Sequence, residues 1–131
     1  MSALYLDTSA FVKLAVEEPE TTSLREFLAA RGSRRVSCAL LRAESLRAVR
    51  HLGAEALATI REGLRRVDLV AIDDRILDAA GTLDPRVLRT LDAIHMATAI
   101  ALGDDLEAIV TYDARMIEAA GLMGLAIATP R

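Results

Sequence analysis

Short apolar runs alternate along the whole chain with stretches of helical periodicity. The apolar runs predict five short buried strands, at residues 3–6, 35–38, 69–72, 108–111 and 125–128. The periodic stretches predict helices at residues 10–16, 20–31, 40–52, 54–67, 92–102 and 114–120, with one more starting at Asp73–Asp74 and a polar connection at 82–89. Strands that alternate with helices predict an α/β fold, in which helices cover both faces of a central parallel sheet of about five short strands. Because no repeat or linker interrupts the pattern, we expect one domain over residues 1–131.

Composition narrows the class of protein. With 53% hydrophobic residues, the chain of 131 residues has enough apolar side chains for a compact core, which excludes intrinsic disorder. The one cysteine, Cys38, excludes a disulfide framework and a cysteine-based zinc site. The longest charge-free stretches, 93–103 and 119–130, are shorter than the roughly 18 residues of a membrane helix. The first residues also lack the basic segment of a signal peptide, so we expect a cytoplasmic protein with no membrane partner.

The net charge of -3 at first argues against a nucleic-acid partner, but the charges are unevenly distributed. Residues 1–30, 31–66 and 67–131 carry 2, 9 and 5 bases against 5, 3 and 11 acids, so their balances are -3, +6 and -6. All but one of the 16 basic residues are arginine, which suits bidentate contacts with phosphate. Arg61 and Arg65, on one face of the predicted helix 54–67, are candidate RNA contacts. The same pattern is typical of solvated helix faces, or of surfaces for a protein partner.

Three acidic residues occupy positions that lead to one edge of the predicted sheet. Asp7 ends the first strand, Asp113 follows the fourth, and Asp92 begins the most apolar helix. Ligands of open α/β sheets bind beyond the carboxyl ends of the strands, so these side chains are candidates for a shared site. Each also has a structural explanation, as a helix-start acid or a turn residue.

Glu44 adds a fourth carboxylate, within a helix whose apolar stripe runs close to it. A glutamate near a buried face needs either a metal ion or an ion pair, for which Arg47 and Arg50 are near in sequence. Clustered carboxylates repel one another, and a hard divalent cation relieves that repulsion. Mg²⁺ or Mn²⁺ held by Asp and Glu is typical of phosphodiester hydrolysis by a metal-activated water.

Four segments in order resemble the PIN-domain ribonucleases, and specifically the VapC-type toxins of bacterial and archaeal toxin–antitoxin operons. They are YLDTSA at 5–10, VS at 36–37 followed by Glu44, LDAIHMAT at 91–98 and TYDAR at 111–115. The resemblance implies that Asp7, Glu44, Asp92 and Asp113 are catalytic and bind Mg²⁺ or Mn²⁺, supported by Ser9 and Thr111. It further implies a homodimeric endoribonuclease that cleaves structured RNA, such as tRNA or rRNA, inhibits translation, and is neutralised by a cognate antitoxin.

Other residues and other functions fit the sequence less well. His95 lies three positions after Asp92 and is either an RNA contact or a half-buried histidine satisfied within the fold. A receiver domain would need an acidic pair after the first strand and a lysine after the fifth, and no lysine follows Lys13. A phosphatase of the Asp-x-Asp type is disfavoured by Asp7-Thr8-Ser9. A non-catalytic, RNA-binding or regulatory PIN relative stays as the alternative, disfavoured because all four acids are present.

Overall fold

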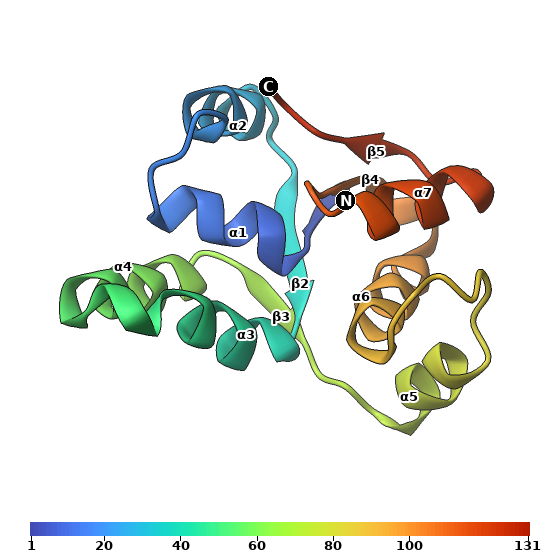
Figure 1. Ribbon diagram of the computed structural model, residues 1–131. Coiled ribbons are helices and arrows are strands. Elements are labelled where there is room, and N and C mark those ends of the chain that lie inside the picture. The colour runs from blue at the N-terminus through green and yellow to red at the C-terminus, as the bar shows by residue number, and fades with distance from the viewer.

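The five predicted strands form one parallel sheet in the computed structural model, which describes residues 1–131 (Figure 1). The strands are β1 (Ala3–Leu6), β2 (Arg34–Cys38), β3 (Asp68–Val70), β4 (Leu106–Val110) and β5 (Ile127–Ala128), in the spatial order β3-β2-β1-β4-β5. Each neighbouring pair is parallel. The sheet therefore has all its carboxyl ends at one edge, with β1 in the centre.

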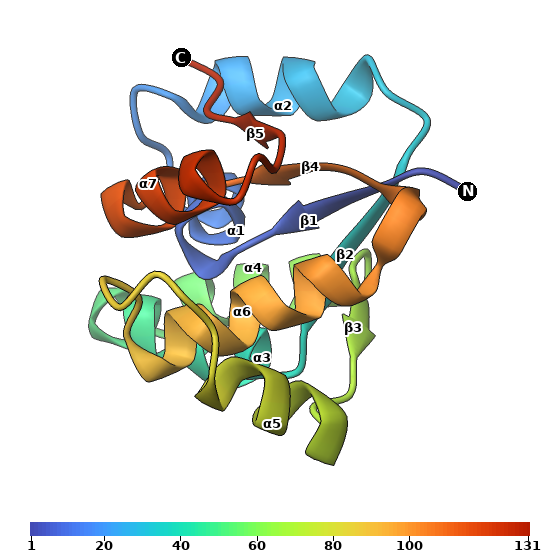
Figure 2. The same cartoon turned by 90° about the vertical axis from the view of Figure 1, so that its right-hand side faces the viewer.

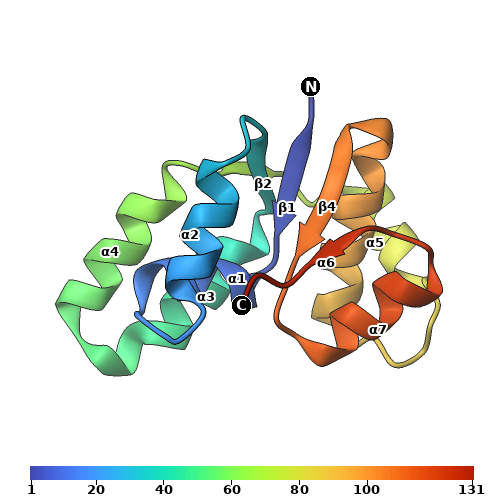
Figure 3. The same cartoon turned by 90° about the horizontal axis from the view of Figure 1, so that it is seen from above.

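Helices cover both faces of this sheet. The α-helices are α1 (Thr8–Ala15), α2 (Thr21–Ala29), α3 (Leu40–Val49), α4 (Ala54–Leu64), α5 (Asp74–Gly81), α6 (Thr90–Ala101) and α7 (Ala114–Leu122), with short 3₁₀ turns at Arg50–Leu52 and Gly103–Asp105. Figure 3 shows α1 to α4 on one side of the strands and α5 to α7 on the other. The predicted α/β architecture is confirmed, and none of its helices is long and apolar enough to span a bilayer.

The alternation of side chains along β1 builds two separate cores. Leu4 and Leu6 point to the layer of α1 to α4, where they join Phe11 in a buried cluster. Ala3 and Tyr5 point to the opposite layer, where their cluster draws on α6 and α7. All four residues of β1 are buried, as expected for the central strand of a sheet covered on both faces. Figure 2 shows α5 packed along α6, which completes the second layer.

Several element boundaries differ from the predicted ones for local reasons. The first helix begins at Thr8 and not at residue 10, because Asp7 caps it by accepting a bond from the Ala10 backbone nitrogen. The predicted helix 40–52 is α3 followed by a 3₁₀ turn, which ends where Gly53 adopts a φ of 97°. The last strand, β5, is only two residues long and pairs with β4 alone, at the edge of the sheet.

Candidate active site

Asp7 leaves the carboxyl end of the central strand and is held on both carboxylate oxygens. Its Oδ1 accepts bonds from Ser9 Oγ at 2.7 Å and from the Ala10 nitrogen at 3.1 Å, and its Oδ2 accepts one from Thr111 Oγ1 at 2.5 Å. Burial, at 4% exposure, raises the pKa of Asp7, and the three hydrogen bonds oppose that rise. Asp7 is therefore both the cap of α1 and a rigidly oriented carboxylate.

Ser9 and Thr111 join the start of α1 to the loop after β4. The Ser9 hydroxyl donates to Asp7 and accepts from the Tyr112 backbone nitrogen at 2.9 Å. The Thr111 hydroxyl likewise donates to Asp7 and accepts from the Asp113 backbone nitrogen at 3.1 Å. Each hydroxyl thus donates its proton to Asp7 and accepts a bond from a backbone nitrogen of the loop after β4, which fixes Asp113 relative to Asp7.

Asp113 and Asp92 each stand at the start of a helix. Asp113 caps α7, with Oδ1 accepting from the backbone nitrogens of Arg115 at 2.8 Å and Met116 at 3.3 Å. Asp92 lies in the first turn of α6, which runs back along the sheet and so begins at the same edge. Burial and then the charge of Asp113 raise the pKa of Asp92, while the backbone of Arg89 lowers it. Both carboxylates thus stand where a helix begins at this edge of the sheet, and their charges repel each other.

Glu44 is bound through one carboxylate oxygen. Oε1 accepts from Thr8 Oγ1 at 2.8 Å and from His95 Nε2 at 2.7 Å. These contacts lower the pKa of Glu44 against the effect of burial, which raises it. The alternative ion pair with Arg47 or Arg50 is wrong, because Glu44 turns toward α1 and α6 and its one charged partner is His95.

His95 lies beneath the site and not on its surface. At 3% exposure its ring is closed off from solvent, so the expectation that it contacts RNA is not met. Nδ1 lies 2.7 Å from Tyr5 Oη and 3.5 Å from Cys38 Sγ. Burial lowers the pKa of His95, but Cys38 and Glu44 outweigh it and raise the value to about 10. The sequence did not identify Thr8 and Tyr5 as neighbours of the site, although both lie inside the segment YLDTSA.

The four predicted acids reach one edge of the sheet from four different elements, but they do not form a tight cluster. No three His, Cys, Asp or Glu side chains lie close enough together to hold one metal ion. The donor set nevertheless fits Mg²⁺, which takes oxygen ligands and is usually held by only one or two carboxylates together with water. The mutual repulsion of Asp92 and Asp113 is the feature of this site that a divalent cation would relieve.

Two pockets lie away from the acids, in the layer of α1 to α4. A pocket of about 300 Å³ between α3 and α4 is lined by Arg42, Leu46, Arg61, Leu64 and Arg65. It brings the predicted RNA contacts Arg61 and Arg65 together with Arg42, which the sequence did not single out.

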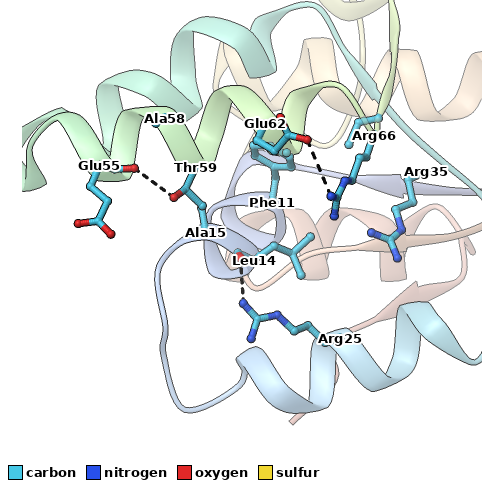
Figure 4. A pocket seen from close by; sticks show the side chains of 12 residues that line it. Phe11, Leu14, Ala15, Arg25, Arg35, Glu55, Ala58, Thr59, Glu62 and Arg66 are labelled. Carbon is cyan, nitrogen blue, oxygen red and sulfur yellow. Dashed lines mark hydrogen bonds and ion pairs between the residues drawn. The ribbon is translucent and has the colours of Figure 1, made fainter.

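The second pocket is larger, about 560 Å³, and lies between α1, α2 and α4 (Figure 4). Its apolar lining includes Phe11 and Leu14 of α1. Figure 4 shows Arg35 and Arg66 at one end and Glu55 at the other. An apolar interior with a charged rim is typical of a surface that receives a protein segment.

Comparisons with known proteins agree with this architecture. The model of the family described as PIN domain matches residues 4–122. Ribonuclease VapC46 of Mycobacterium tuberculosis is 52% identical over 130 residues, which span 99% of this chain and 99% of the relative. Ribonuclease VapC47 of the same species is 37% identical, over 97% of this chain and 96% of the relative.

Solved structures show the same fold at lower identity. The crystal structure of M. tuberculosis VapC20, described as a Sarcin-Ricin loop cleaving toxin, aligns with a TM-score of 0.75 and 16% identity over 97% of this chain and 99% of that chain. A toxin–antitoxin complex from Klebsiella pneumoniae aligns with a TM-score of 0.74 and 22% identity over 99% of this chain and 98% of that chain. The chain therefore belongs to the PIN-domain family and, within that family, to the VapC ribonucleases.

Proposed function

We propose that this protein is a Mg²⁺- or Mn²⁺-dependent endoribonuclease, the toxin of a toxin–antitoxin pair. The observation that carries the proposal is the delivery of Asp7, Glu44, Asp92 and Asp113 to one sheet edge by four different elements. VapC46, a named ribonuclease, is 52% identical over nearly the whole chain, which supports the same activity here.

A divalent ion would be held chiefly by Asp92 and Asp113, whose repulsion it would neutralise, with the carboxylate of Glu44 as an outer-shell partner. When bound, such an ion would offset the charge of a phosphodiester and lower the pKa of a coordinated water. Asp7 contributes a fixed negative charge, because Ser9 and Thr111 hold both its oxygens. No histidine is needed as an acid or base, which agrees with the burial of His95.

The substrate we propose is structured RNA, tRNA or rRNA, whose cleavage in the cytoplasm would inhibit translation. Arg42, Arg61 and Arg65 support an RNA partner, because three guanidinium groups around one pocket suit the phosphate backbone. Arg42 lies in the first turn of α3, the helix that also carries Glu44. A strand of RNA bound at these arginines would therefore lie against the helix that carries Glu44.

The protein partner we propose is a cognate antitoxin, with the chain itself a homodimer. The pocket between α1, α2 and α4 supports an antitoxin, because its apolar interior and its rim of arginines and glutamates suit an amphipathic segment with charged residues. The Klebsiella pneumoniae structure, whose fold matches this chain, is described as a toxin–antitoxin complex. A small reading frame adjoining the gene for this protein would identify the candidate.

The function is tested by removing each carboxylate without changing its size. Asp7→Asn, Glu44→Gln and Asp92→Asn are each expected to lower Mg²⁺- or Mn²⁺-dependent RNA cleavage by about 100-fold. Asp92 is a direct ligand in this proposal, and the loss of an outer-shell group such as Asp7 or Glu44 costs up to about 100-fold. Asp78→Asn, an exposed aspartate on α5, removes the same charge away from the site and is the matched control. Circular dichroism establishes that each variant is folded.

The two candidate functions give opposite results in this experiment. Cleavage by the wild type and by Asp78→Asn, lost in the three site variants and in EDTA, supports the ribonuclease. Cleavage retained by all three site variants contradicts the assignment of the site. RNA binding without cleavage by the wild type, in either metal, would instead identify the non-catalytic PIN relative.

A further inference from the structure

A line of buried polar side chains connects the centre of the sheet to Glu44. Tyr5 of β1 contacts His95 Nδ1 through its hydroxyl at 2.7 Å, and His95 Nε2 contacts Glu44 Oε1 at 2.7 Å. Tyr5 is fully buried and His95 is 3% exposed, while the Glu44 side chain is 25% exposed. The line therefore leads from the interior to a carboxylate at the surface of the site.

Both ring nitrogens of His95 are occupied, which fixes the ring in one orientation. The Glu44 carboxylate only accepts hydrogen bonds, so Nε2 is the donor in that contact. The Tyr5 ring meets the His95 ring edge-on, with centroids 5.9 Å apart and planes at 77°. A ring flip would exchange nitrogen for carbon at both contacts and leave two buried polar groups without partners.

The two contacts also distinguish the two oxygens of Glu44. His95 Nε2 and Thr8 Oγ1 both bind Oε1, the latter at 2.8 Å. Oε2 is not engaged by either donor. One oxygen is thus used for attachment to the protein, and the other is left for an ion or a substrate.

We propose that His95, held in place by Tyr5, is a positioning residue that fixes Glu44 with Oε2 directed to the acidic site. The inference deepens the proposed function and rests on the assignment of Glu44 to that site. His95 follows Asp92 by one turn of α6, so a single helix both carries one acid and sets the position of another. The contact also ties α3 to α6, which lie on opposite faces of the sheet.

Three substitutions separate the donor function of His95 from its bulk. His95→Leu removes both ring nitrogens, and is expected to weaken Mn²⁺ binding and lower kcat by about 10- to 100-fold, the usual effect of losing an outer-shell partner. His95→Gln supplies an amide donor to Glu44 and is expected to recover most of this loss. Tyr5→Phe keeps the ring but not the hydroxyl. It is expected to weaken Mn²⁺ binding and lower kcat by about threefold to tenfold, the equivalent of one neutral hydrogen bond.

Thr98→Val is the matched control for a buried polar change on the same helix. Thr98 is 1% exposed, and its hydroxyl donates only to the Ile94 carbonyl of α6, at 2.7 Å. Its variant is expected to bind Mn²⁺ and cleave RNA like the wild type, even if it unfolds at lower urea. Equal kcat and equal Mn²⁺ affinity in wild type, His95→Leu and Tyr5→Phe would overturn the inference. If His95→Leu does not fold, Tyr5→Phe is compared with Thr98→Val instead. Equal kcat and equal Mn²⁺ affinity in these two variants would then overturn the inference.

Side-chain ¹⁵N NMR tests the contact without any catalytic assay. The chain has only two histidines, and His51 is exposed, so the His95 resonances are readily assigned. Glu44→Ala and Tyr5→Phe are expected to shift the His95 nitrogens and leave those of His51 in place. Unshifted His95 signals in both variants would overturn the inference. If the wild type cleaves no RNA, the proposed function fails, and the Mn²⁺ titration and the NMR shifts still decide the positioning of Glu44.

Discussion

At the scale of single residues, the carboxylates of this site differ in how far the protein satisfies them. Asp7 accepts three hydrogen bonds and Glu44 accepts two. Asp92 instead faces the charge of Asp113, and this repulsion adds to burial in raising its pKa. In the metal-free protein, the repulsion at Asp92 is therefore not offset as the charges of Asp7 and Glu44 are. A bound cation would be most favourable at this position.

Removing this charge is expected to stabilise the metal-free protein. Because the folded-state pKa of Asp92 is raised above its ordinary value of 3.8, the penalty is absent at lower pH. It grows as the pH rises through the raised pKa and is complete at neutral pH. Asp92→Asn in EDTA should thus be more stable than wild type at pH 7, by no more than about 1 kcal/mol because solvent screens the pair.

Urea unfolding at pH 7 and again near pH 3.5 checks both halves of this prediction. The gain should become much smaller at the lower pH, where Asp92 is mostly protonated in both states. Asp78→Asn should show no gain at either pH. A less stable Asp92→Asn at pH 7 would mean that the carboxylate makes a favourable contact that outweighs the repulsion.

The sequence identifies the acidic residues of the site more readily than the residues that contact them. Asp7 and Asp113 were identifiable because each follows an apolar strand, and strand ends meet at one edge of a parallel sheet. The contact between Glu44 and His95 joins residues 51 positions apart on different helices, and no local pattern encodes it. Sequence neighbours suggested arginine partners for Glu44, but the packing of α3 against α1 determines which way its side chain turns.

At the scale of elements, the alternation of apolar runs and periodic stretches identified all five strands and their parallel pairing. The errors lie at element ends, where capping and edge effects decide. Lys13 illustrates a contact between elements that periodicity does not reveal. In the last turn of α1, its ammonium group pairs with Glu18 at 2.5 Å and Glu20 at 3.4 Å, and lies 4.8 Å from the centre of the Tyr112 ring.

Lys13 is therefore expected to fasten the loop before α2 and the loop after β4 to α1. Burial lowers its pKa, but the two glutamates outweigh burial and raise it above 10.5. The stabilisation is thus complete below about pH 10.5 and is lost as the pH rises through the raised pKa. Lys13→Met, which keeps the aliphatic stem, should unfold at lower urea than wild type at pH 8, and the difference should shrink near pH 11.5.

Arg25→Met is the matched control, because the ion pair of Arg25 with Glu17 has side chains 55% and 66% exposed. An exposed pair of this kind contributes little, so this variant should unfold close to wild type. Equal unfolding midpoints for Lys13→Met and Arg25→Met at pH 8 would contradict the role given to Lys13.

At the scale of the whole molecule, the fold places basic and acidic residues in different regions, which the net charge of -3 does not reveal. The segment 31–66, with its balance of +6, forms β2, α3 and α4 on one side of the protein. Its arginines Arg42, Arg61 and Arg65 gather at one pocket, while the acids gather at the edge of the sheet. If two divalent ions bind at the acids, the net charge rises by 4, from -3 to +1. A polyanionic substrate is therefore compatible with an acidic composition.

The charge separation predicts how RNA binding should respond to salt. In an Asp7→Asn background, which prevents cleavage, Arg61→Glu with Arg65→Glu should weaken RNA binding and reduce the slope of log Kd against log salt by about 2, one for each lost phosphate contact. Arg75→Glu with Arg86→Glu makes the same change in net charge on exposed positions in and after α5, and is the matched control. An unchanged slope in the Arg61 and Arg65 variant would show that those arginines do not contact the RNA backbone, and would leave a solvated helix face or a protein partner as their role. Equal effects of both pairs would show that net charge alone, and not the pocket between α3 and α4, governs binding.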